Sequence, residues 1–397
     1  MFIIPIKQII GKNIIIMWSL IKSLSAPLLS LVFMMLASGF FNTFVSLRLE
    51  IEGVSSEMIG VVTSALYVGI LVGSLLKVDR WIIKTGHIRS FVILASLLTA
   101  LALVQSFLVN PWFWAVLRFL GGICTAGVFI IIESWVLMQS APNMRGGVLS
   151  IYLGVFYGAL SCGQFFIDLT DPLGIYPFII TALFVVFSIL PITTRKVTEP
   201  LMKEAERLTL HQLFKISPLS FIGGVISGMI LAIVMGLVPV YAKEIGMTVS
   251  EVGTFMAMMI FGGFSLQWPV GRWADKTDRR CVIKVMSFLA AFFGLGFGFA
   301  GHSYILHLVL AWFFGGFAFT LYPLSMAYAC ERVQESQIVA ATGGFVLSYG
   351  FGAITGPLIA PLAMSYFGPE GLFYFMSFIA AILGLVGFKR PSPIPLK

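Results

Sequence analysis

Two charged residues inside one apolar stretch are the first candidates for chemistry. Arg118 lies near the start of the stretch 112–138, and Glu133 follows it 15 positions later. On a helix this spacing puts the two side chains about 60° apart around the axis and about 22 Å apart along it. They can therefore face one cavity without touching. Ionisable groups inside a membrane mark functional sites, so Glu133 is predicted to carry a proton and Arg118 is predicted to face the cavity or a polar partner.

Each of these residues also has a structural interpretation. Arg118 could extend its side chain towards the nearer membrane surface and serve only packing. Glu133 lies near the end of its stretch and could bond to the following loop around Arg145. Both alternatives stay open on the sequence alone.

A cluster of charge follows the apolar stretch 251–270. Asp275 stands there among basic residues, where charge-assisted hydrogen bonds could hold neighbouring helices together. A contact that breaks and re-forms suits a molecule with two states, so a cytoplasmic gate is predicted. The alternative is basic charge that only sets membrane orientation. The gate residues are Gly271, Arg272, Asp275, Arg279 and Arg280.

Polar and amphipathic side chains inside apolar stretches are candidate solute contacts, although each could instead serve hydrogen bonding between helices. Together they predict a weakly polar, aromatic-lined site with little fixed charge, which suits a neutral or amphiphilic small molecule. The candidates are Asn42, Tyr67, Gln105, Tyr157, Gln164, Gln267, Trp268, Tyr322 and Tyr349.

Sequence patterns of enzymes are absent. The chain has no Gly-x-x-x-x-Gly-Lys-Ser/Thr loop for ATP, no His-Glu-x-x-His and no Gly-x-Ser-x-Gly. Its four cysteines have neither metal-ligand nor disulfide spacing. We expect no catalysis, no cofactor and no metal. A lipid-modifying membrane enzyme, the rival class, would need clustered His, Asp or Ser at one membrane face.

Composition places these residues in a membrane. Of the 397 residues 59% are hydrophobic and only 11% are charged, and the mean hydropathy is +1.00. A bilayer crossing takes about 20 apolar residues. The sequence contains twelve such stretches and predicts twelve transmembrane helices, near 27–47, 58–76, 90–109, 112–138, 147–167, 175–194, 220–241, 251–270, 282–300, 305–329, 340–362 and 372–388.

The basic residues alternate between the connecting loops. With both termini placed in the cytoplasm, 22 of the 25 Lys and Arg residues fall on the cytoplasmic side. Only Arg48 and Lys243 fall outside, and Arg118 lies within a span. This is the positive-inside pattern. The net charge of +8 is thereby explained by topology, and no nucleic-acid partner is needed.

The chain also repeats itself at an offset of 194 residues. Gly69 meets Gly263, and Gly121-Gly122 meets Gly315-Gly316. Two six-helix bundles of the same orientation, related by a pseudo-twofold axis, can enclose a cavity that opens to each side in turn. The expected parts are an N-terminal cytoplasmic or interfacial arm (1–26), an N-terminal bundle (27–194), a cytoplasmic linker (195–219), a C-terminal bundle (220–388) and a cytoplasmic tail (389–397). Translation could start at Met1 or Met17.

These motifs resemble the major facilitator superfamily. The segment from Gly271 to Arg280 is similar to the family's loop motif Gly-x-Leu-Ala-Asp-Arg-x-Gly-Arg-Arg, with Trp273 in place of Leu and Asp278 in place of the second Gly. Arg118 and Gly122 match the Arg-x-x-x-Gly motif that the family links to proton coupling. The loop of the first half departs from the pattern, and Gly356-Pro357 lies in the eleventh span rather than the fifth.

The resemblance implies a secondary transporter that moves a small solute by alternating access, coupled to protons or another ion. We expect a monomer surrounded by membrane lipids, with many spans in the bacterial inner membrane. Proton-driven efflux of amphiphilic compounds is the alternative within the class.

Overall fold

The computed structural model describes residues 6–76, 78–138, 145–194, 210–334 and 337–388. Most of the predicted linker, the predicted tail and the first five residues lie outside this part of the chain. Apart from two short 3-10 segments, the regular elements in the described ranges are α-helices.

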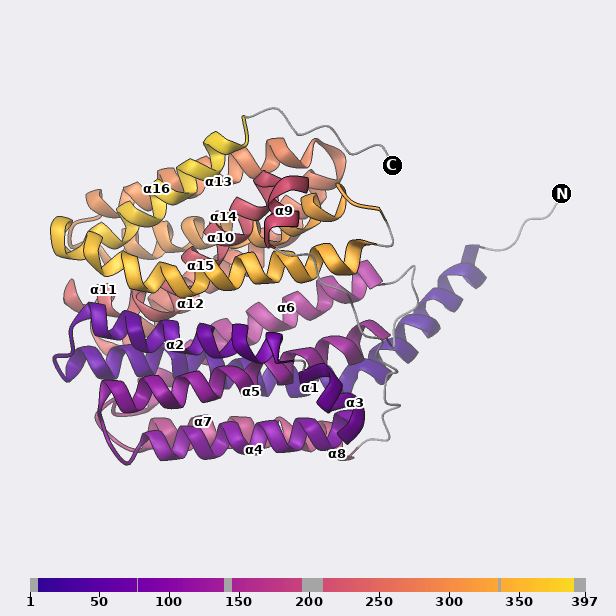
Figure 1. The fold of residues 1–397 in the computed structure, drawn as a ribbon, viewed down its shortest axis with the longest axis horizontal. Coiled ribbons are helices and arrows are strands. Elements are labelled where there is room, and N and C mark those ends of the chain that lie inside the picture. Colours follow the sequence, from indigo (N-terminus) through magenta and orange to yellow (C-terminus); the bar gives the residue numbers. More distant parts are fainter. Residues whose placement is uncertain (1–5, 77, 139–144, 195–209, 335–336, 389–397) are drawn as a thin grey trace.

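The N-terminal half runs from α1 to α8 (Figure 1). Its helices include the six spans predicted for this half, the sixth of them in two pieces, α7 and α8. The elements are α1 (Ile6–Ile51), α2 (Ser56–Leu75), α3 (Val78–Thr85), α4 (His87–Gln105), α5 (Pro111–Met138), α6 (Arg145–Gln164), the 3-10 segment η2 (Phe165–Leu169), α7 (Tyr176–Phe187) and α8 (Ile189–Thr194).

The C-terminal half runs from α9 to α16, and α10 with α11 forms its first span in two pieces. The elements are α9 (Leu210–Ile216), α10 (Pro218–Gly236), α11 (Val238–Glu244), α12 (Val249–Lys276), α13 (Arg279–Gly296), the 3-10 segment η3 (Phe297–Phe299), α14 (Tyr304–Cys330), α15 (Ile338–Phe367) and α16 (Gly371–Val386).

Helix lengths agree with the predicted spans. Within the described residues, eleven helical segments are long and apolar enough to cross a membrane, and α16 is a shorter apolar helix at the position of the twelfth. The first spanning segment begins at Leu24, but α1 itself begins at Ile6. Residues of the predicted arm are thus continuous with the first transmembrane helix.

Local sequence explains where the helices begin. The Ser55 side chain accepts a hydrogen bond from the backbone of Met58 at the start of α2. At the start of α12, Thr248 and Glu251 form a reciprocal capping box. Glycines with positive φ, such as Gly53, form the preceding turns.

The two halves share a packing device based on glycine. A Cβ built on Gly122 of α5 would overlap the carbonyl oxygen of Leu66 on α2. In the second half, a Cβ built on Gly315 of α14 would overlap the carbonyl oxygen of Met259 on α12. The repeated glycines therefore bring the backbones of these helix pairs into direct contact.

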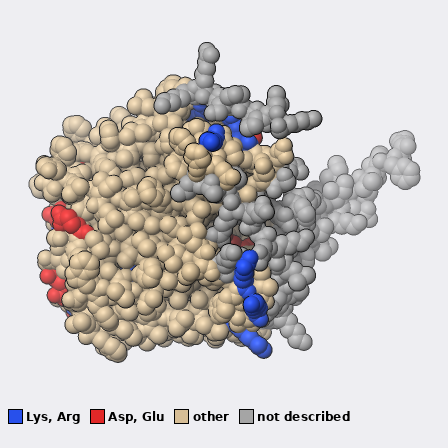
Figure 2. Space-filling view, in the orientation of Figure 1, with Lys and Arg blue, Asp and Glu red and all other residues tan. Residues whose placement is uncertain are grey.

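The molecule has two chemically different ends. Acidic side chains gather at one end of the helices and basic side chains at the other (Figure 2). We call the first, which carries Glu52, Glu57 and Glu244, the acidic end. The second, which carries Arg80, Lys276 and Arg279, is the basic end.

The halves contact each other at the acidic end, where α2 packs on α15 and α6 packs on α12. The Ser64 hydroxyl donates to the carbonyl oxygen of Ile354 at 2.8 Å, and the Ser161 hydroxyl donates to that of Ala257 at 2.9 Å. Next to them, Ser56 donates to a carboxylate oxygen of Glu244 at 3.2 Å.

Candidate functional site

A cavity of about 1490 Å³ lies between the two halves and extends to the basic end. Helices α1, α2, α4, α5, α6 and α7 line it from the N-terminal half, and α10, α12, α14, α15 and the first residue of α13 line it from the C-terminal half. All but one of the predicted solute contacts line this space. They are Asn42, Tyr67, Gln105, Tyr157, Gln267, Trp268, Tyr322 and Tyr349.

Gln164 is the exception. Its side chain is fully buried between α1 and α6, where it accepts a hydrogen bond from Thr43 at 2.7 Å and donates to the carbonyl oxygen of Gly39 at 2.9 Å. Both ends of the amide are thus used in helix packing. This corrects its predicted place in the cavity, because a polar side chain in an apolar helix can serve either purpose.

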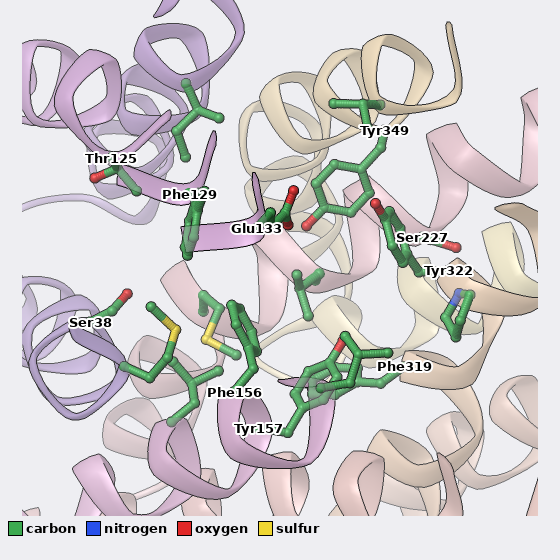
Figure 3. Close-up of a pocket in the computed structure, with 18 of the residues that line it drawn as sticks. Ser38, Thr125, Phe129, Glu133, Phe156, Tyr157, Ser227, Phe319, Tyr322 and Tyr349 are labelled. Carbon is green, nitrogen blue, oxygen red and sulfur yellow. The ribbon is translucent and has the colours of Figure 1, made fainter. Parts of the chain in front are cut away.

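Glu133 projects into the cavity from α5. The hydroxyl of Tyr152 on α6 donates a hydrogen bond to its Oε1 at 3.2 Å. Figure 3 shows the carboxylate between Phe129 on one side and Tyr349 and Tyr322 on the other. A contact to Arg145, the predicted alternative, involves a side chain outside the described part of the structure.

Arg118 lies deeper, towards the acidic end, and its residue is 8% exposed. One terminal nitrogen donates to Oδ1 of Asn42 at 2.7 Å, and the guanidinium lies 5.3 Å from the ring centre of Phe41. Its Nε makes no hydrogen bond, and no carboxylate of the described residues pairs with it. The side chain faces the cavity rather than the membrane surface.

Aromatic rings form the wall between these two charges. The rings of Tyr322 and Tyr349 meet edge to face at 5.0 Å, and Tyr157 stacks on Phe319 across the two halves at 5.9 Å. Such rings offer apolar faces, and the tyrosines add hydroxyl groups. The site therefore combines an aromatic surface with very few charges.

The predicted gate residues lie at the basic end of the C-terminal half. Arg279 pairs with Asp275 at 3.0 Å and also with Glu331 at the end of α14. Arg272 stacks on the Trp268 ring at 3.8 Å. These residues and Gly271 line the mouth of the cavity.

Arg280 is placed differently from the other gate residues. Its Nε donates to the carbonyl oxygen of Gly387 at 2.6 Å, which connects the start of α13 to the end of α16. The residue is absent from the cavity lining. Its contact stabilises the outer helices of the half.

Several lining residues were not predicted. Ser38, Thr125 and Ser227 face the cavity, and Ser227 keeps a buried hydroxyl without a hydrogen-bond partner (Figure 3). Tyr152 binds Glu133. Small hydroxyl residues are common in packed membrane helices, so the sequence gives no signal that separates these serines from others. In the described residues, no three His, Cys, Asp or Glu side chains are placed to hold a metal ion.

Comparison with known proteins gives the class. The sequence model of the Major Facilitator Superfamily matches residues 28–306 and 220–396. The chain therefore belongs to this family of membrane transporters, whose members are not enzymes, and the predicted twelve-helix fold is confirmed.

The relatives are themselves described only by class. An uncharacterised MFS-type transporter of Enterobacter sp. (strain 638) is 29% identical over 92% of this chain and 96% of its own. The uncharacterised MFS-type transporter YcaD of Escherichia coli O6:K15:H31 (strain 536 / UPEC) is 30% identical over 92% and 95%.

Solved structures share the fold at low identity. The D-xylose-proton symporter superimposes with a TM-score of 0.76 at 15% identity, covering 94% of this chain and 98% of its own. The nucleoside transporter NupG gives a TM-score of 0.75 at 13% identity, covering 92% and 99%.

Proposed function

We propose that this protein is a proton-coupled secondary transporter of a small solute that works by alternating access. One observation carries the proposal: the cavity reaches one end of the molecule, is closed at the other by contacts between the halves, and contains the carboxyl group of Glu133. A closed end and an open end are what one state of a rocking transporter requires.

In this proposal Glu133 carries the proton and Arg118 fixes the charge balance of the cavity. A carboxyl group hydrogen-bonded by a tyrosine can bind and release a proton as water reaches it. The two residues share one helix, so a proton at Glu133 and a solute near Arg118 respond to the same movement of α5.

The positive-inside pattern supports an orientation with the basic end in the cytoplasm of a bacterial inner membrane. The conformation described above is then open inward. The pairing of Arg279 with Asp275 and Glu331 holds the mouth of the C-terminal half in shape, and we assign the gate to this cluster. The transporter is proposed to act as a monomer.

Efflux of amphiphilic compounds is the second candidate. The aromatic wall favours it, because Phe129, Phe156 and Phe319 can hold apolar bodies of different shapes. Uptake and efflux differ in direction and not in the assigned proton carrier.

The test uses purified full-length protein in liposomes with a trapped pH indicator. Candidate solutes are added and the evoked pH change is recorded, followed by accumulation under an imposed pH gradient. We expect Glu133→Gln to retain solute exchange and to lose gradient-driven accumulation. Full accumulation by Glu133→Gln would contradict the assignment, and a solute that moves without any pH change would contradict proton coupling.

A further inference from the structure

The cavity extends between α1, α4, α5 and α7 of the N-terminal half, and we call this part of it the side pocket. Residues of α4 and α7, helices on the outer side of this half, join α1 and α5 in lining it. In the second half the corresponding helices are α13 and α16, and only Arg279, at the first position of α13, reaches the cavity. The side pocket is thus a specific feature of one half.

Two buried nitrogen donors that line the side pocket make no hydrogen bond. Gln105 of α4 is 2% exposed, and its Nε2 makes no hydrogen bond. Nε of Arg118 is likewise unpaired, although the other side of the guanidinium is held by Asn42. Buried donors without partners are uncommon in folded proteins, and these two line the same space.

The unbalanced charge is the stronger observation. Desolvation of a guanidinium costs several kcal/mol unless an anion or a set of hydrogen bonds compensates for it. Among the described residues Arg118 receives one neutral amide oxygen and one aromatic face, and Tyr67 lies close enough to interact with it electrostatically. None of these groups is a carboxylate, so they compensate for a positive charge only in part. A ligand that brings a negative charge would complete the site.

The walls of the side pocket are apolar. Met34, Leu98, Leu101, Leu117 and Val185 line it from four helices. A guanidinium with donors to spare, next to an apolar pocket, matches a carboxylate attached to an apolar body.

We infer that the transported solute is a small amphiphilic monoanion whose carboxylate binds Arg118 and whose apolar body occupies the side pocket. This inference rests on the proposed function and names its substrate class. Glu133 lies about 22 Å further along α5, so a small solute does not bridge the two residues. A proton carried at Glu133 together with a monoanion at Arg118 would make the coupled movement electrically neutral.

The binding test uses full-length protein in detergent and does not depend on transport. The probes are 4-phenylbutyrate, its amide and 4-phenylbutylamine, which share one apolar body and differ in charge. Thermal stabilisation as a function of concentration gives each Kd. We expect the carboxylate to bind at least tenfold more tightly than the amide, and the amine to bind more weakly than both. Equal affinity for carboxylate and amide, or no carboxylate binding at 10 mM, would overturn the inference.

Two substitutions sharpen the test. Arg118→Gln should remove the preference for the carboxylate, whereas Arg89→Gln, an exposed residue outside the cavity, should leave it unchanged. Asn42→Asp places a carboxylate next to Arg118, so it should raise the melting temperature of the free protein and weaken carboxylate binding at least tenfold. A lower melting temperature of Asn42→Asp would mean that the charge of Arg118 is already balanced, and it would overturn the inference.

The outcomes for the inference and for the proposed function are separable. Carboxylate binding that depends on Arg118, without proton-linked transport in liposomes, would support the inference and contradict the function. Proton-linked transport of a neutral solute, without carboxylate binding, would support the proposed function and contradict the inference.

Discussion

The two halves of the molecule use one scaffold for different purposes. Both halves carry packed rings at the acidic end: Phe178 meets Phe44 edge to face at 4.9 Å in the N-terminal half, and Tyr241 meets Phe373 edge to face at 4.9 Å in the C-terminal half. The C-terminal half adds Phe297, which stacks on Phe373 at 3.6 Å. The hydroxyl of Tyr241 also contacts Nε2 of His307 at 3.1 Å. The halves differ in their outer helices: residues of α4 and α7 line the cavity, whereas of α13 and α16 only Arg279 does so.

The charges follow the same division. At the offset of 194 residues, Arg118 corresponds to Trp312 and Glu133 to Ala327. Conversely, Arg279 and Asp275 of the gate correspond to Thr85 and Trp81. Duplicated helices thus keep their packing, while the ionisable groups of the cavity stay in one half and those of the gate in the other.

The largest expected effect comes from moving the carboxyl group between halves. In the double variant Glu133→Ala with Ala327→Glu, the carboxyl still lines the cavity, but its tyrosine partner is missing because Tyr152 corresponds to Val346. We expect solute accumulation under a pH gradient to stay at the level of simple equilibration. Recovery to the level of the unaltered protein would show that either half can hold the proton carrier.

Next in size is the effect of the shared scaffold. Gly122→Ala and Gly315→Ala each place a methyl group against a backbone carbonyl, so each should destabilise the protein by about 1–3 kcal/mol. Gly158→Ala is the control, since a Cβ there meets nothing within 4 Å. Thermal unfolding in detergent measures all three. If only one of the two glycine substitutions lowers the thermal stability, the two halves do not depend equally on close helix contacts at glycine.

A smaller effect is expected at the gate. Arg279→Gln removes two ion pairs whose carboxylate side chains are 71% and 51% exposed, and exposed pairs contribute about 0–1 kcal/mol each. Initial transport rates should change by a few fold at low salt, and the difference should shrink as salt screens the charges. Thr85→Val, at the corresponding position of the first half, is the matched control. A salt-independent change would indicate a packing defect instead.

The smallest effect concerns pH at the acidic end. Burial, together with the nearby carboxylates of Glu57 and Glu370, raises the pKa of Glu244 above its usual value, and the hydrogen bond from Ser56 lowers it in part. The closed end therefore holds a proton more tightly than an open, hydrated end would. Because the closed state binds this proton more tightly, lowering the pH should favour closure.

Spin labels can measure this shift in a variant without native cysteines. Labels at Leu108→Cys and Ser250→Cys, exposed at the acidic end of opposite halves, should show more of the short-distance population as the pH falls. Glu244→Gln should weaken the pH dependence. An unchanged dependence in Glu244→Gln would assign it to another carboxyl group of this end, such as Glu50.

Much of the fold could be read from the sequence because the bilayer imposes it. Apolar length fixed the spans, and the repeat offset identified glycines that do meet other backbones, such as Gly122. The site was harder to predict. Gln164 and Gln105 look alike in sequence. The amide of Gln164 is hydrogen-bonded at both its oxygen and its nitrogen, whereas the amide nitrogen of Gln105 makes no hydrogen bond. That difference depends on helix rotation, which a single sequence does not encode locally.

The asymmetry itself also lay beyond the sequence. Residues of α4 and α7 line the cavity although α4 packs on α5 and α7 packs on α1, whereas of α13 and α16 only Arg279 reaches it. Phe297 and Phe373 are far apart in the chain, and each could equally face lipid. Only their three-dimensional packing shows that the two rings stack on each other.

The contact between α2 and α15 has a consequence for how easily the halves can separate. A Cβ on Gly60 would overlap the carbonyl oxygen of Pro357, and Ser64 bonds to the carbonyl of Ile354 nearby. The seal therefore includes close main-chain contacts and a short hydroxyl group. Each such hydrogen bond contributes about 0.5–1.5 kcal/mol beyond what water offers in exchange. Entering water can replace these hydrogen bonds one at a time, so this part of the seal can open and re-form in small steps.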